Sequence, residues 1–186
     1  EQLGIVHAPL VGHSMGGTVS LSVAIKYPER VSKVVVVGSP MVGSSLAPLL
    51  KLAGMRPIAF MLFNMMGVFR TGMRMYSPFI CRDPRFPEMM DRDLSRTTVE
   101  SFLLSIASLR RTDLTPMLSQ IKVPAMGMFG DKDVIVHPLQ WQPMLKGIPH
   151  SVIERFPTSG HFPMLEEPTI FSQKLKSFLD QDIPTP

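Results

Sequence analysis

The chain has 186 residues, of which 45% are hydrophobic and 18% are charged, so it can bury a real core and is not intrinsically disordered. Its formal net charge is +4, and no run of five or six like charges occurs, so we expect no nucleic-acid partner. The longest apolar stretch, residues 58–69, is shorter than the about 20 residues that a spanning helix needs, so we expect a buried or cleft-lining helix and no membrane span.

The first elements follow from apolar runs. Residues 7–12 (HAPLVG) and 31–38 (VSKVVVVG) predict two strands, and the four consecutive valines indicate a strand that is buried on both faces. Between them, residues 17–27 predict a helix that Pro28 ends. Residues 1–6 are expected to be the end of a preceding helix.

Residues 41–121 break this alternation. They are rich in Met, Pro and Arg and lack a buried-strand pattern, so we expect a helical insertion. Within it, Thr97-x-x-Glu100 matches a capping box. Apolar residues then recur at helical spacing as far as Leu109, which predicts a helix after Thr97.

Strands predicted at residues 123–130 and 151–156 and helices predicted at 138–146 and 168–179 resume the alternation. Strands that alternate with helices are typical of an α/β fold with a parallel sheet. We therefore predict such a core from residues 1–40 and 122–186, with a helical cap insertion at 41–121.

Gly12-His13-Ser14-Met15-Gly16 fits the pattern G-x-S-x-G and lies between a predicted strand and a predicted helix. In that context the pattern is a sharp turn that lifts the serine hydroxyl out of the sheet, and small residues at 12 and 16 let backbone pass close by. The N–H of Met15 would face a developing oxyanion from a helix N-terminus. We predict that Ser14 is a nucleophile and that His13 is structural.

A serine nucleophile needs a base and an orienting acid. Asp131 and Asp133 follow one predicted strand, and His161 follows the last. The carboxyl ends of parallel strands lie at one edge of a sheet, where such sheets place their sites. We predict His161 as the base and Asp133 as the acid, with Asp131 as the alternative.

Three segments together resemble the α/β-hydrolase-fold family. GHSMGG (12–17) resembles its nucleophile elbow, VPAMGMFGDKDVIVHP (123–138) resembles the strand and loop that carry the acid, and SGHFPMLEEP (159–168) resembles the loop that carries the base. The order serine, aspartate, histidine is also the order in that family. The family's G-x-x-D pattern matches Asp133, which leaves Asp131 to brace the loop.

The resemblance also implies that the chain is an N-terminally truncated, C-terminal part of such a protein. Family members begin with more strands and with a loop that supplies a second oxyanion donor. By common domain size, roughly 80 to 100 residues would precede Glu1. We expect this chain alone to be weakly active.

A cap over the cleft would bring apolar side chains to the substrate. Methionines suit an irregular apolar pocket, so Met61, Met65, Phe69 and Phe162 are predicted to contact a small apolar acyl substrate. Plain core packing is the alternative interpretation of these residues.

The predicted function is that of a serine hydrolase that cleaves a carboxylic ester through an acyl-enzyme, without a cofactor. No histidine pair has metal-ligand spacing, so no metal site is expected. Cys81 is the only cysteine, which excludes an internal disulfide and fits a cytoplasmic location. A C–C bond hydrolase, an acyltransferase and a non-catalytic ligand-binding protein of the same fold remain alternatives, and the oligomeric state is open.

Overall fold

The computed structural model describes residues 4–53, 55, 58 and 66–181. Strands alternate with helices at both ends of the chain, and helices without a named strand fill the middle. The elements in chain order are β1 (Ala8–His13), α1 (Met15–Lys26), β2 (Val31–Val37), α2 (Pro48–Ala53), α4 (Met66–Ile80), α5 (Phe86–Arg96), α6 (Val99–Leu109), β3 (Ala125–Gly130), α7 (Trp141–Gly147), β4 (Val152–Phe156), α8 (Pro163–Glu166) and α9 (Pro168–Asp180).

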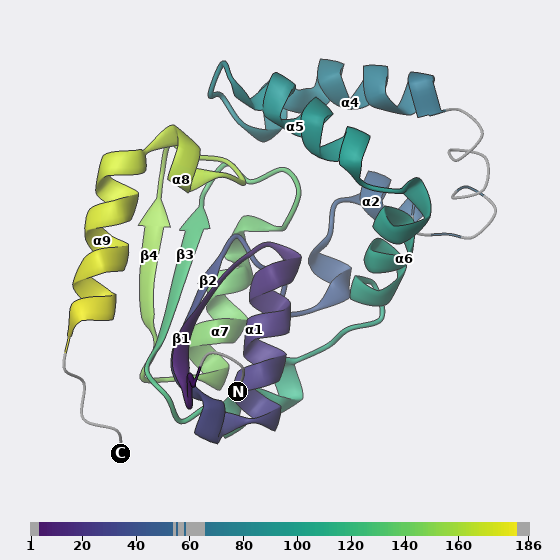
Figure 1. The fold of residues 1–186 in the computed structure, drawn as a ribbon. Coiled ribbons are helices and arrows are strands. Elements are labelled where there is room, and N and C mark those ends of the chain that lie inside the picture. The colour runs from purple at the N-terminus through teal and green to yellow at the C-terminus, as the bar shows by residue number, and fades with distance from the viewer. Residues whose placement is uncertain (1–3, 54, 56–57, 59–65, 182–186) are drawn as a thin grey trace.

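The four strands form one parallel sheet in the order β1-β2-β3-β4. Helices α1 and α7 lie on one face of the sheet and α9 lies on the other (Figure 1). The predicted α/β fold with a parallel sheet is confirmed. All four strands therefore end at one edge, and the loops that follow them meet there.

The valine run of β2 explains how the sheet is held between its helices. Val34 and Val36 pack in a cluster with side chains of α1 and α7. Val35 and Val37 point the other way and pack with two phenylalanines of α9. Because successive side chains of a strand face opposite sides, a continuous run of valines fills both layers and fixes the platform on which the loops stand.

The two ends of the segment that carries the central helices are hydrogen-bonded to each other. The backbone N–H of Gly43 donates to the carbonyl of Thr112 at 2.7 Å, and that of Leu114 donates to the carbonyl of Met41 at 2.9 Å. Helices α4 and α5 lie beyond the carboxyl ends of the strands, near α8 (Figure 1). Within the described ranges, no helix combines the length and the hydropathy needed to cross a bilayer.

The predicted capping box is wrong by one residue. Thr98 is the N-cap of α6, where its hydroxyl oxygen accepts a hydrogen bond from the N–H of Ser101 at 3.2 Å. Thr97 instead ends α5, because its own N–H donates to the carbonyl of Leu94. Two adjacent threonines can each cap a helix, and the preceding helix decides which one does.

The structure describes only residues 4–6 of the helix end predicted for residues 1–6. These residues are not helical, and Gly4 has a φ of 66°, the conformation that commonly follows the last turn of a helix. Residues 1–3 lie outside the described residues, as do 59–65 of the apolar stretch at 58–69.

Candidate active site

Ser14 occupies the turn between β1 and α1. Its φ of 53° and ψ of −123° make it the one non-glycine residue with positive φ in the described part of the chain. Its N–H donates to the carbonyl of Val37, at the end of the neighbouring strand, at 2.8 Å. Such backbone conformations cost about 1–3 kcal/mol and persist where the surrounding structure enforces them.

Two glycines make this turn possible, and they are not the two that the motif predicts. A Cβ at Gly12 would lie 2.4 Å from the backbone of Gly16, so the strand can pass the helix only with glycine there. A Cβ at Gly17 would lie 1.9 Å from the hydroxyl oxygen of Ser39. Nothing lies within 4 Å of a Cβ placed at Gly16. The expectation that position 16 needs a small residue is therefore wrong in the described structure, and Gly17 carries that constraint.

Asp133 and His161 form a buried pair. Nδ1 of His161 lies 2.7 Å from Oδ2 of Asp133, and their side chains are 4% and 3% exposed. The other carboxylate oxygen accepts hydrogen bonds from the backbone N–H groups of Ile135 and Val136 at 2.8 and 2.9 Å. The loop after β3 thus fixes the carboxylate, which fixes the imidazole ring and leaves Nε2 free to take a proton.

Asp131 lies elsewhere. Its carboxylate pairs with Arg155 on the surface, at 2.7 Å from Nη2. It makes no contact with His161 among the described hydrogen bonds. The geometry therefore selects Asp133 as the partner of the imidazole.

Gly38 makes room for this pair. Its φ is 52°, and a Cβ there would lie 3.2 Å from Nδ1 of His161 and 3.4 Å from Oδ2 of Asp133. Gly38 follows β2, and its N–H donates to the carbonyl of Met128 in β3 at 2.9 Å. The sequence indicated only a strand end at this position, so this role was missed.

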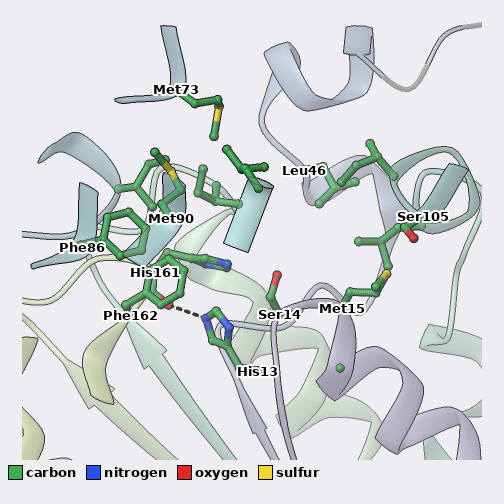
Figure 2. A pocket seen from close by; sticks show the side chains of 16 residues that line it. His13, Ser14, Met15, Leu46, Met73, Phe86, Met90, Ser105, His161 and Phe162 are labelled. Atoms are coloured by element: carbon green, nitrogen blue, oxygen red, sulfur yellow. Dashed lines mark hydrogen bonds between the residues drawn. The ribbon is translucent and has the colours of Figure 1, made fainter. Parts of the chain in front are cut away.

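The imidazole of His161 extends towards the hydroxyl of Ser14 across the floor of a pocket (Figure 2). No hydrogen bond joins the two side chains among those between described residues. Met15 lies on the other side of Ser14 in the same view. Because α1 begins at Met15, its N–H is a first-turn donor without an intrahelical acceptor, as an oxyanion site requires.

His13 braces the base loop from below. Its Nε2 lies 2.9 Å from the carbonyl oxygen of His161, and since a carbonyl can only accept, Nε2 carries the proton. Burial and the neighbouring His161 lower the pKa of His13 to about 4, so the ring is neutral at neutral pH. The predicted structural role of His13 therefore has a specific target, the backbone of His161.

Two glutamates of the segment after the base brace the same loop. Glu166 accepts hydrogen bonds from the N–H of Gly160 at 2.6 Å and from the N–H of Arg82 at 3.1 Å. Glu167 accepts from the hydroxyls of Thr158 and Ser159 at 2.7 and 2.6 Å, and these bonds lower the pKa of Glu167. Arg82 follows α4, so Glu166 ties the base loop to the central helices.

The pocket above Ser14 has a volume of about 380 Å³. Figure 2 shows Met73, Phe86, Met90 and Phe162 on its walls, together with the imidazole of His161. Its lining is apolar apart from Ser105 and the residues of the site itself. The full lining is His13, Ser14, Met15, Gly16, Leu46, Met73, Ile80, Phe86, Met90, Leu94, Ser105, Ile106, Leu109, Ile135, His161 and Phe162.

The structure gives different outcomes for the predicted substrate contacts. Phe162 lines the pocket. Met61 and Met65 lie outside the described residues, and Phe69 belongs to α4. Sequence reasoning missed the contribution of α5, whose signal was the spacing of Phe86, Met90 and Leu94 along one helix face.

Neither a metal site nor a reactive thiol is visible in the described part. No three of its histidine, cysteine, aspartate or glutamate side chains are grouped to hold a metal ion. Cys81 is buried, and burial raises the pKa of its thiol. The chemistry available at the pocket is that of a hydroxyl, an imidazole and a buried carboxylate.

Curated proteins are similar to this chain in sequence. A 3-oxoadipate enol-lactonase of Acinetobacter baylyi is 26% identical over 96% of this chain and 66% of its own length. A 2-hydroxy-6-oxononadienedioate/2-hydroxy-6-oxononatrienedioate hydrolase of a Pseudomonas species is 30% identical over 96% of this chain and 65% of its own length. The chain thus spans about two thirds of the length of the curated relatives it matches, and both of these relatives are hydrolases.

Solved structures give the same fold. A hydrolase from Pseudomonas aeruginosa superposes with a TM-score of 0.80 at 22% identity, over 97% of this chain and 67% of that one. The α/β hydrolase fold family matches residues 1–168, which include both the turn at Ser14 and the loops of Asp133 and His161. With its parallel sheet and its serine at the strand-to-helix turn, the chain belongs to the α/β-hydrolase fold family.

Proposed function

We propose that the protein is a serine hydrolase that cleaves an uncharged carboxylic ester through an acyl-enzyme. The observation that carries this proposal is the placement of Ser14, on a strained turn, beside the buried Asp133–His161 pair. Strain of this kind is a feature of functional sites, and the pair supplies what a serine hydroxyl lacks, a positioned base.

In the proposed reaction, Oγ of Ser14 attacks the carbonyl carbon while Nε2 of His161 takes its proton. The N–H of Met15 stabilises the oxyanion, and the imidazolium returns the proton to the leaving alcohol as the C–O bond breaks. Water, deprotonated by His161, then cleaves the acyl-enzyme. Asp133 holds the ring with Nδ1 protonated and stabilises its charged form.

The pocket supports an apolar, uncharged substrate. The described residues that line it include no lysine or arginine, and His13 is neutral at neutral pH because its pKa is about 4. A carboxylate in such a lining would lose its hydration without a cationic partner. The predicted small apolar acyl substrate fits these side chains, and we further propose that residues 41–121 act as a cap above Ser14.

A second candidate is a C–C bond hydrolase, because several of the relatives are named as hydrolases of 2-hydroxy-6-oxo carboxylates, which contain no ester bond. One of them acts on 2-hydroxy-6-oxo-6-phenylhexa-2,4-dienoate, a phenyl-substituted carboxylate. The phenyl group of this dienoate is compatible with the apolar pocket. The carboxylate of the same molecule has no lysine or arginine partner in the described lining. We therefore rank the ester first.

The experiment is a comparison of phenyl acetate with that dienoate, with two matched variants. Asp133→Asn should lower kcat on the ester by roughly 10³- to 10⁴-fold, because the imidazole loses its orienting charge. Asp131→Asn should change it less than about twofold, because that carboxylate forms only a surface pair.

Faster turnover of the dienoate than of the ester would establish the second candidate. Equal effects of the two asparagine variants would contradict the assigned triad. If Ser14→Ala bound apolar esters but neither it nor the unaltered protein hydrolysed any substrate, the non-catalytic alternative would stand.

A further inference from the structure

A second cavity lies behind the wall of the first. It has a volume of about 410 Å³ and opens between α5 and the segment that follows His161. One side is formed by α5, and the other by Phe162, Met164 and Leu165. Its volume falls within the range of small-molecule sites.

One helix face serves both cavities. Phe86, Met90 and Leu94, spaced four residues apart on α5, line the first cavity and the second. The neighbouring stripe of Met89, Asp93 and Thr97 lines only the second. Residues three, four, seven and eight apart lie on one side of a helix, so a ligand that passes α5 would move from one stripe to the next.

The wall between the cavities consists of side chains that can move. The rings of Phe86 and Phe162 touch with centroids 4.6 Å apart at 51°. Met90 and Leu94 complete the shared wall. An unbranched methionine changes rotamer readily, so Met90 is the member of this wall whose movement would join the two cavities.

The position of this wall relative to the reacting atoms identifies which part of a substrate meets it. Phe162 directly follows His161, and it lies with Phe86 and Met90 on the imidazole side of Ser14, opposite Met15 (Figure 2). The alcohol that leaves the carbonyl carbon attached to Ser14 must accept its proton from the imidazole. The leaving alcohol therefore points towards the second cavity, and the acyl group points away from it.

The lining of the second cavity sets the chemistry of its occupant. Seven of the nine lining residues are apolar; the other two, Asp93 and Thr97, are exposed. Among the described residues around it, none is a lysine, arginine or histidine. An anionic group would have no partner there, whereas an alkyl chain or an aryl ring would replace water against apolar side chains.

We propose that this second cavity is a binding subsite for the uncharged alkyl or aryl part of the leaving alcohol. The inference rests on the proposed function, because it takes its direction from the proton transfer by His161. Esters of longer apolar alcohols should then be preferred over esters of ethanol, by roughly fourfold in kcat/KM for each methylene that enters the subsite.

The test is the dependence of kcat/KM on alcohol chain length, from ethyl to octyl acetate. Met89→Trp fills the second cavity from a position that does not line the first. This variant should leave kcat/KM for ethyl acetate unchanged. It should lower kcat/KM for octyl acetate about tenfold or more, because two or more methylenes are displaced from the cavity. Glu88→Trp places the same side chain one residue away, at an exposed position. This variant should show the same dependence of kcat/KM on alcohol chain length as the unaltered protein.

Met89→Ala gives the opposite change and guards against a folding defect, since it should extend the preference to longer alcohols. A matching series of ethyl esters with longer acyl chains should not respond to Met89→Trp, because the short alcohol does not reach the second cavity. If the acyl series responded instead, or if Met89→Trp left octyl acetate unchanged, the assignment of this cavity to the leaving alcohol would be wrong.

A binding measurement separates this inference from the proposed function. Titration of 1-octanol into Ser14→Ala, with and without Met89→Trp, reports the subsite in the absence of catalysis. Weaker binding with the added tryptophan supports the subsite even where no ester is hydrolysed. Equal binding in both backgrounds rejects the subsite even where Ser14 is shown to be the nucleophile.

Discussion

The backbone and the side chain of Ser14 contribute to different properties of the protein. The backbone conformation affects stability, and the hydroxyl serves the proposed chemistry. A φ of 53° with a ψ of −123° is a conformation that glycine accepts and other residues adopt at a cost. The hydroxyl, by contrast, makes no hydrogen bond to His161 among the described contacts. The side chain therefore adds little to stability in the resting protein.

Glycine should therefore stabilise the turn relative to alanine. Ser14→Gly should raise the free energy of unfolding by about 1 kcal/mol relative to Ser14→Ala, because it relieves strain that exceeds the entropy glycine adds to the unfolded chain. Both variants should lack esterase activity. Urea unfolding measures the difference, and a glycine variant less stable than the alanine variant would show that the turn is not strained.

His13 predicts a pH dependence of stability. Its pKa is about 4 in the fold against an ordinary 6.5, so between these values the unfolded chain binds a proton that the folded chain does not. The free energy of unfolding should therefore fall as the pH is lowered from about 6.5 to 4, by up to about 3 kcal/mol.

The variant that checks this is His13→Gln, whose amide N–H can still donate to the carbonyl of His161 and does not titrate. Urea unfolding at several pH values should give a flatter curve for the variant than for the unaltered protein above pH 4. Parallel curves would mean that His13 is not buried as a neutral ring.

At the scale of elements, the junction of β1 and α1 depends on close backbone contact. Gly17→Ala should lower the melting temperature by several degrees, since its Cβ would meet the Ser39 hydroxyl at 1.9 Å and the strand and helix would have to separate. Gly16→Ala, with open space around the added carbon, should not. Thermal unfolding of the two variants checks this, and equal losses would place the constraint on both glycines.

The segment β4–α8 positions the base through Glu166. Its two oxygens accept from two fixed backbone N–H groups, of Gly160 and Arg82. Glu166→Gln must turn an amide NH₂ towards one of them, so we expect the loop of His161 to shift and kcat to fall about tenfold with KM little changed.

Glu167→Gln is the matched control for that prediction. Its partners are hydroxyls, which can rotate to suit an amide, so its effect on kcat should be smaller. Steady-state kinetics with phenyl acetate measures both, and Glu166→Asp should restore part of the activity. A larger effect at Glu167 would remove Glu166 from the positioning role.

At the scale of the whole molecule, the parallel sheet brings three distant segments to one edge. Much of this was predictable, because the alternation of apolar runs is local in sequence and because the loops after β1, β3 and β4 must share an edge once the sheet is parallel. The positions of Ser14, Asp133 and His161 followed from that argument.

What the sequence could not predict depends on contacts between segments far apart in the chain. The space left by Gly38 and the bond from Glu166 to Arg82 exist only once the loops and the central helices meet. The N-cap of α6 was predicted one residue too early for a related reason, because Thr97 ends α5. The contribution of α5 to the pocket wall could not be predicted either, because it depends on where that helix lies above the sheet.

The most direct test of the central claim is intact-mass measurement after exposure to a fluorophosphonate. We predict a single adduct that is absent from Ser14→Ala and forms much more slowly in His161→Gln, because the hydroxyl then lacks its base. An adduct that persists in Ser14→Ala, or that forms equally fast without His161, would contradict the assignment of Ser14 as a nucleophile activated by His161.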